Sequence, residues 1–156
     1  MDGESGIVAG ADRERALLAL WSELTQATDR VRAGLVRALD DGSGLAPEEV
    51  EVLMLLASTH ERRLRMIDVS EALRLSKSGV TRLIDRLQDR GFVVRAACPS
   101  DRRVVYAGLT DEGATALDGA APLFVAGLAS QLGERLDADR VERLRADLRE
   151  IAGCET

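Results

Sequence analysis

Residues 76 to 90 place hydrogen-bonding side chains at helical spacing opposite an apolar stripe. The stripe repeats at i, i+3, i+4 and i+7 and consists of Val80, Leu83, Ile84 and Leu87. The other side of the expected helix carries Lys77, Ser78, Thr81, Arg82, Asp85, Arg86, Gln88 and Asp89. Because such side chains can pair with the edges of stacked base pairs, this face is suited to a nucleic-acid groove.

Within this face, each candidate contact has its own chemistry. Arg82 has a planar fork that pairs with a guanine edge or a phosphate. Ser76, the expected N-cap, and Ser78 lie beside free amides at the helix start, where a phosphate can bind. The candidate DNA contacts of the helix are Ser76, Lys77, Ser78, Thr81, Arg82 and Arg86. The alternative is an ordinary solvated helix face.

A second candidate group follows Pro99 and Ser100 in an expected turn. Asp101 and Arg103 are two residues apart, so the carboxylate can hold the guanidinium in a fixed pose. An arginine oriented in this way at a hairpin tip can enter a narrow A·T-rich minor groove, while Arg102 would meet the backbone. The alternative is a surface salt bridge.

The surrounding elements predict a mainly α fold with a small β-hairpin wing. Residues 67–75 predict a short helix directly before the helix over 76–90, and two short helices joined by a tight turn form a helix-turn-helix. Gly91 ends the second helix. Residues 92–97 and 104–109 then alternate as two strands, and a hairpin in this place is the wing of a winged helix.

The flanking segments predict dimerisation helices around this centre. We expect a disordered tail over 1–10, a dimerisation helix over 11–45, a winged helix-turn-helix domain over 46–109 and C-terminal dimerisation helices over 110–156. Long apolar stripes in the first and last thirds need a partner to cover them. The helix that begins with Pro47 has Ala46 as a poor cap, so its start is expected to fray.

Charge is distributed unevenly along the 156 residues. The net charge is −6, yet residues 60–106 hold eleven Arg and Lys against six Asp and Glu, a balance of +5. The remainder has a balance of −11. A basic insert in an acidic frame suits a protein that touches phosphates at one surface only. The alternative is a basic excess that is only solvated surface.

Several function classes are disfavoured by composition. No apolar run is long enough to span a membrane and no targeting pattern opens the chain, so a cytoplasmic protein is expected. Cys98 and Cys154 lack metal-ligand spacing, and His60 is the single histidine, so no metal site or cofactor is predicted. With one histidine, no glycine-rich phosphate loop and no grouped carboxylates, we do not expect an enzyme.

Three motifs in order resemble the MarR family of bacterial winged helix-turn-helix transcriptional regulators. They are Leu-Ser-Lys-Ser-Gly-Val-Thr-Arg-Leu-Ile-Asp-Arg-Leu (75–87) with Arg-Gly-Phe-Val (90–93), Cys-Pro-Ser-Asp-Arg-Arg (98–103) and Leu-Thr-Asp-Glu-Gly (109–113). The likeness runs from about Trp21 to Ile151. It departs at Ala46, where Ser or Thr is frequent, and at Val104, where a small residue is frequent.

The resemblance implies an obligate two-fold homodimer of six-helix winged-helix protomers that binds a palindromic operator in double-stranded DNA. It also implies release by a small aromatic or phenolic acid or by thiol oxidation. We therefore expect a repressor that binds a pseudo-palindrome. The alternative is a winged-helix protein-interaction module that does not bind DNA.

Two further residue groups could sense a signal. Oxidation of Cys98, at the base of the wing, would disturb the hairpin and loosen DNA binding. Trp21 and Phe124 could line an effector pocket between the dimer helices and the winged helix, or they could be plain core residues. No other ligand-binding residue is indicated.

Overall fold

The computed structural model describes residues 3–40, 42–98, 100–101 and 103–153, with only the backbone described over 3–11. The chain forms two compact units. One comprises residues 35–130, and the other comprises residues 1–34 together with 131–156. The unit over 35–130 contains every predicted nucleic-acid contact.

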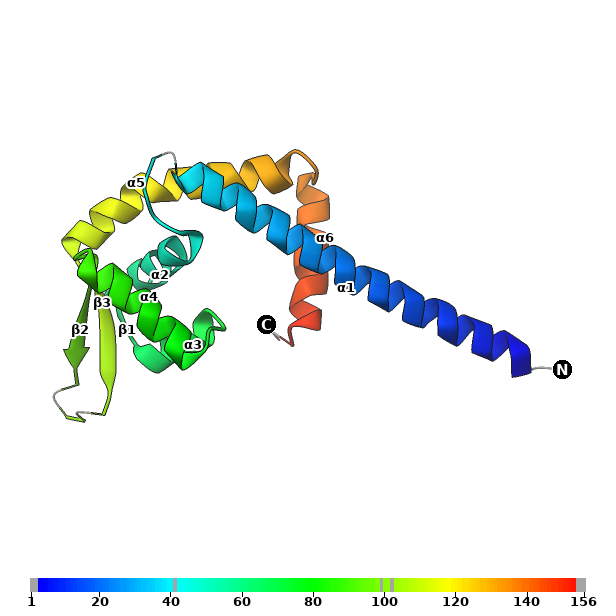
Figure 1. Ribbon diagram of the computed structural model, residues 1–156, viewed down its shortest axis with the longest axis horizontal. Coiled ribbons are helices and arrows are strands. Elements are labelled where there is room, and N and C mark those ends of the chain that lie inside the picture. Colours follow the sequence, from blue (N-terminus) through cyan, green and yellow to red (C-terminus); the bar gives the residue numbers. More distant parts are fainter. Residues whose placement is uncertain (1–2, 41, 99, 102, 154–156) are drawn as a thin grey trace. The chain divides into compact units, whose positions relative to one another are not determined.

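The unit over 35–130 is a three-stranded sheet packed with helices (Figure 1). Its elements are α2 (Pro47–Ala57), β1 (Arg63–Arg65), α3 (Met66–Ala72), α4 (Lys77–Asp89), β2 (Val93–Ala97), β3 (Val105–Leu109) and α5 (Asp111–Leu128). Its core is mainly aliphatic, and its largest fully buried side chains include Leu39, Leu53, Leu56, Ile84 and Leu87. The predicted fold class, mainly helical with a small wing, is confirmed.

Helix α4 forms as its periodicity predicts. All four residues of the apolar stripe are buried. The Ser76 hydroxyl accepts a hydrogen bond from the Gly79 amide at 3.1 Å, which caps the helix. Gly91 has φ +77°, a left-handed conformation that ends the helix and that glycine adopts without strain. The helix therefore begins and ends where local sequence signals place it.

The wing has one strand more than the sequence predicts. The strand order is β1-β3-β2, and both pairings are antiparallel. The hairpin pairs Val93 with Leu109 at one end and Ala97 with Val105 at the other. Strand β1 lies inside residues 60–65, which carry no strand pattern because three residues are too few to show alternation. Its pairing with β3 is what forms it.

The start of α2 is capped from within the helix. The Ala46 amide donates to Glu49 Oε2 at 3.0 Å, which satisfies one of the free donors at the helix start. The expected fraying is therefore not supported, because the glutamate three residues on supplies the acceptor that the alanine lacks.

Helix α5 belongs to the winged-helix unit. The Thr110 hydroxyl caps it by accepting from the Gly113 amide at 2.9 Å, and Leu117, Ala120 and Phe124 are buried. The predicted boundary at residue 110 thus differs from the observed one, because α5 packs on α2 and only the segment from 131 onward joins the other unit.

The second unit consists of most of α1 (Gly3–Asp40), the end of a π-helical turn η1 (Ala129–Gly133) and α6 (Ala138–Ile151). The predicted tail over 1–10 is wrong for residues 3–10, which are helical. Adding residues to an existing helix costs far less than nucleating one. Residues 1–2 and 154–156 lie outside the described residues. Large apolar side chains of this unit are exposed: Leu17, Leu18, Leu20, Trp21, Leu132, Leu144, Leu148 and Ile151.

Candidate nucleic-acid interface

The outer face of α4 carries exposed side chains from its N-terminal half. The structure places Ser76, Lys77, Ser78, Thr81 and Arg82 there, all exposed to solvent. Among the described residues, none forms a hydrogen bond or ion pair with the Lys77 amine or the Arg82 guanidinium. Two cations are therefore available to a partner.

Hydroxyl groups on this face are anchored to the helix. Thr81 Oγ1 donates to the Lys77 carbonyl at 2.9 Å, and the Ser76 and Ser78 hydroxyls lie 3.2 Å apart. Because Ser76 already accepts from the Gly79 amide, its main role in this structure is to cap the helix. A phosphate at this helix start remains a prediction.

Arg86 differs from its neighbours on α4. Its Nε donates to Glu49 Oε1 at 3.2 Å, and the Glu49 side chain is buried. This ion pair gives Arg86 a structural role that the sequence did not predict. Its contact with DNA stays a prediction.

The wing presents one oriented arginine. Asp101 accepts from the Arg103 backbone amide at 3.0 Å, from Nε at 3.2 Å and from a terminal nitrogen at 3.3 Å. These hydrogen bonds hold the pKa of the Asp101 carboxyl below its usual value. The Arg103 side chain is 92% exposed, so it is held in a pose that faces solvent. Arg102 lies outside the described residues.

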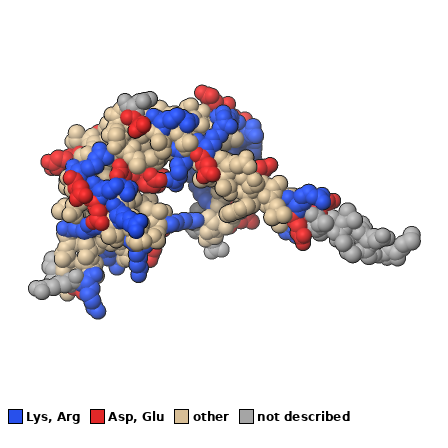
Figure 2. Space-filling view, viewed as in Figure 1, with Lys and Arg blue, Asp and Glu red and all other residues tan. Residues whose placement is uncertain are grey.

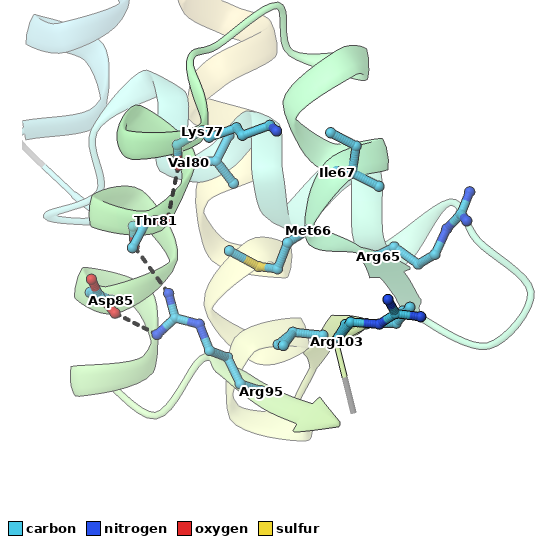
Figure 3. Close-up of a pocket in the computed structure, with 11 residues that line it drawn as sticks. Arg65, Met66, Ile67, Lys77, Val80, Thr81, Asp85, Arg95 and Arg103 are labelled. Carbon is cyan, nitrogen blue, oxygen red and sulfur yellow. Dashed lines mark hydrogen bonds and ion pairs between the residues drawn. The ribbon is translucent and has the colours of Figure 1, made fainter. Parts of the chain in front are cut away.

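A hollow of about 600 Å³ lies between α3, α4 and the wing (Figure 3). Its apolar lining is Met66, Ile67, Val80, Val104 and Val105, and its polar lining includes Arg65, Lys77, Thr81, Asp85, Arg95 and Arg103. The predicted contacts Lys77, Thr81 and Arg103 thus line one concave surface formed by helix and wing together.

Arg95 on β2 joins the wing to α4. One terminal nitrogen donates to the Thr81 carbonyl at 3.1 Å and the other pairs with Asp85 (Figure 3). Sequence reasoning missed this residue, because nothing in a five-residue strand shows which helix its side chain meets. Through Arg95, the α4 face and the wing are held as one surface.

Charge gathers on this surface. In the space-filling view, Lys and Arg side chains lie over α4 with acidic side chains between them (Figure 2). Three acids of α3, α4 and the wing, Asp68, Asp85 and Asp101, are paired with arginines. At the N-terminal half of α4 the exposed cations Lys77 and Arg82 therefore give this surface a positive electrostatic potential.

Cys98 lies at the end of β2, and its Sγ is 3.1 Å from the Ser100 hydroxyl. The hydrogen bond with Ser100 and those with the Ser100 and Asp101 amides lower the pKa of the thiol. Its predicted role as a redox switch stays a prediction.

The lowered thiol pKa predicts reactivity at mild alkaline pH. In a Cys154→Ser background, the alkylation rate of Cys98 by iodoacetamide should reach half its maximum below pH 9.0, the ordinary thiol value. Ser100→Ala should move this midpoint upward, because the thiolate loses its hydrogen bond with the Ser100 hydroxyl. A midpoint at or above pH 9.0 in the parent would contradict the geometry.

The two expected effector residues are in different surroundings. Phe124 is buried in the core of its unit, whereas Trp21 is 72% exposed in the other unit. Neither lines the hollow at the wing. Their role in an effector pocket stays a prediction.

Within the described residues, no group of three or more His, Cys, Asp or Glu could hold a metal ion, and no helix is long and apolar enough to cross a membrane.

A helix-turn-helix followed directly by a β-hairpin, with cations on both, defines a winged helix-turn-helix protein. A family model described as the MarR family matches residues 43–104. The structure also superposes on Sco3205, a MarR family transcriptional regulator from Streptomyces coelicolor solved in complex with DNA. The TM-score is 0.81 at 30% identity, over 86% of this chain and 84% of that one. This chain belongs to the MarR family.

Other relatives agree with this assignment. CouR from Rhodococcus jostii RHA1, solved bound to p-coumaroyl-CoA, superposes with a TM-score of 0.74 at 28% identity, over 85% of this chain and 91% of that one. An uncharacterized HTH-type transcriptional regulator of Bacillus subtilis, YkoM, is 41% identical over 80 residues, 51% of each chain. The chain spans about half the length of the curated relatives it matches. The family consists of transcriptional regulators, in line with the prediction that this chain is not an enzyme.

Proposed function

We propose that this chain is a DNA-binding transcriptional repressor that acts in the cytoplasm as a homodimer on a pseudo-palindromic operator. The observation that carries the proposal is the shared surface of α4 and the wing. There Lys77 and Arg82 are exposed and unpaired among the described residues, and Asp101 orients Arg103 toward solvent. A relative with this fold and 30% identity was solved in complex with DNA.

Each part of the surface has a partner on B-form DNA. The N-terminal half of α4 would lie in the major groove, with Arg82 on a guanine edge or a phosphate. Arg103 would enter the adjacent minor groove, where a narrow A·T-rich groove deepens the negative potential. Of the other predicted contacts, Ser76, Ser78, Arg86 and Arg102 would meet the sugar-phosphate backbone.

Dimerisation is supported by the exposed apolar side chains of the other unit. Leu144, Leu148 and Ile151 form one stripe of α6, and Trp21 stands on α1 with most of its surface exposed. A second copy would remove this apolar surface from water. A two-fold dimer presents two identical copies of α4 and the wing. Its operator would therefore have two half-sites about one helical turn apart.

Release of DNA by a small aromatic or phenolic effector completes the proposal. A ligand that binds better to a dimer with a different separation of the two α4 helices would weaken operator binding. CouR, which was solved bound to p-coumaroyl-CoA, supports an aromatic ligand class.

DNA binding is tested directly with the single lysine of the chain. Duplexes would be selected by the protein from a random pool, and the protein would be labelled with an amine-reactive acetylating reagent with and without the selected duplex. Lys77 is the only lysine side chain, so mass spectrometry reads one site. We expect selected DNA to protect Lys77, with affinity that falls steeply as salt rises, because neutralised phosphates release counterions.

The rival function makes the opposite prediction. A winged-helix module that binds only protein would select no duplex, would pass through a polyanion column at low salt and would show equal Lys77 labelling with and without DNA. The acidic net charge of −6 opposes nonspecific retention of such a module on a polyanion. Any of these outcomes would contradict the proposal.

A further inference from the structure

Glu49 is a buried carboxylate that joins two elements of the winged-helix unit. It stands in the first turn of α2, with its side chain 7% exposed. One oxygen, Oε1, accepts from Arg86 Nε at 3.2 Å. The other, Oε2, accepts from the Ala46 amide at 3.0 Å and from Arg90 at 3.4 Å. Both arginines lie at the C-terminal end of α4, so the carboxylate fixes that end to the start of α2.

Arg90 is itself held on three sides. The same nitrogen that reaches Glu49 donates to the Gly44 carbonyl at 2.9 Å, and the guanidinium lies 4.7 Å from the centre of the Phe92 ring. A buried charge is costly unless it is paired and hydrogen-bonded, and here every partner of the carboxylate is in place. The cluster of Glu49, Arg86 and Arg90 therefore holds the start of α2 and the C-terminal end of α4 in one relative position.

Apart from the hydrogen bonds that Arg95 donates to Asp85 and the Thr81 carbonyl, the rest of the α4 packing sets the helix direction less closely. Its buried stripe is entirely aliphatic, and apolar contact is not directional. Hydrogen bonds between charged groups are directional and restrict both distance and angle. The Glu49 cluster therefore limits rotation of α4 about the aliphatic core.

We propose that Glu49 is a positioning residue for DNA recognition. Through Arg86 and Arg90 it sets the orientation of α4, so that Arg82 and the wing residue Arg103 reach their grooves together. This inference rests on the proposed function. Glu49 itself does not touch DNA.

Electrostatics alone predicts the opposite effect of removing Glu49. Neutralising one carboxylate in a DNA-facing unit makes that unit more positive, which strengthens binding to any duplex. Loss of positioning weakens binding only to the duplex whose base edges must be met in register. The sign of the change on selected DNA therefore separates the two effects.

The test is Glu49→Gln, which keeps the side-chain volume and an acceptor for the Ala46 amide but removes the charge. Dissociation constants would be measured at one salt concentration for a duplex selected by the parent and for a scrambled duplex of equal length. We expect binding to the selected duplex to weaken about tenfold or more, with binding to the scrambled duplex unchanged or tighter. The ratio of the two affinities should fall.

Glu112→Gln is the matched control. Glu112 is an exposed acid in the first turn of α5, so the variant makes the same charge change at the start of another helix of the same unit. Its binding to both duplexes should be unchanged or slightly tighter. Thermal unfolding of each variant identifies any loss that follows from a misfolded protein.

If Glu49→Gln does not fold, Arg90→Gln tests the same cluster, because it removes the ion pair between Arg90 and Glu49. Arg90 is outside the predicted DNA contacts, so its loss should lower the affinity ratio through positioning. In the double variant the two losses should be less than additive, because both break one cluster.

The outcomes separate the two proposals. If the parent selects a duplex and Glu49→Gln binds it as well or better, or loses affinity equally for both duplexes, the positioning role is wrong and DNA binding stands. If the parent selects no duplex, the proposed function fails and the positioning role falls with it.

Discussion

Replacing Arg82 by alanine should weaken binding to a selected duplex at least about 30-fold. One arginine on a guanine edge is worth about 1–3 kcal/mol, and a two-fold dimer loses it twice, roughly 2–6 kcal/mol in all. Arg82 is exposed and unpaired among the described residues, so the variant breaks no internal ion pair there. Fluorescence anisotropy with a labelled duplex at fixed salt measures the change.

Two companion variants show what Arg82 contacts. Arg82→Lys keeps the charge but loses the planar fork, so it restores binding if the partner is a phosphate and fails to restore it if the partner is guanine. Arg15→Ala makes the same charge change as Arg82→Ala at an exposed position of α1, outside the interface, and should have little effect.

The wing gives an independent check on the same interface. If Arg82→Ala and Arg103→Ala both bound selected DNA as tightly as the parent, the predicted contact set would be wrong. A uniform loss on all sequences from Arg82→Ala, with a shallower salt dependence, would place Arg82 on a phosphate.

The parts of this fold that were predictable are those specified by neighbours in sequence. Helix α4 has its stripe, its Ser76 cap and its Gly91 stop within sixteen residues, and all three form as expected. The pairing of Asp101 with Arg103 was predictable for the same reason, because the two residues are only two positions apart.

The parts that were missed depend on residues far apart in sequence. Strand β1 is formed by pairing Leu64 with Ala107, and three residues carry no pattern of their own. Arg95 meets Asp85 only after the chain has turned through Gly91. The exception is Glu49, whose place three residues after Ala46 is the spacing of a capping glutamate. That signal could have identified its cap role, although not its pairing with Arg86, 37 positions away.

Gly113→Ala should destabilise the winged-helix unit by about 3 kcal/mol. A Cβ at this position would lie 2.1 Å from the Phe92 carbonyl oxygen and 2.9 Å from a Leu109 methyl carbon. The Phe92 carbonyl is held in place by the Thr110 amide at 3.1 Å, so it is not free to move aside. Thermal unfolding followed by circular dichroism should show a midpoint lower by roughly 12–24 °C.

Gly119→Ala in the same helix is the control that isolates the clash. Gly119 is exposed within α5, and an added Cβ there would meet no heavy atom within 4 Å. This variant should raise stability by up to about 1 kcal/mol, because alanine loses less conformational freedom than glycine in a helix. Equal midpoints for the two variants would mean that Gly113 does not lie against the Phe92 carbonyl as described. A fall confined to Gly113→Ala would show that the junction of α5 with the wing requires glycine.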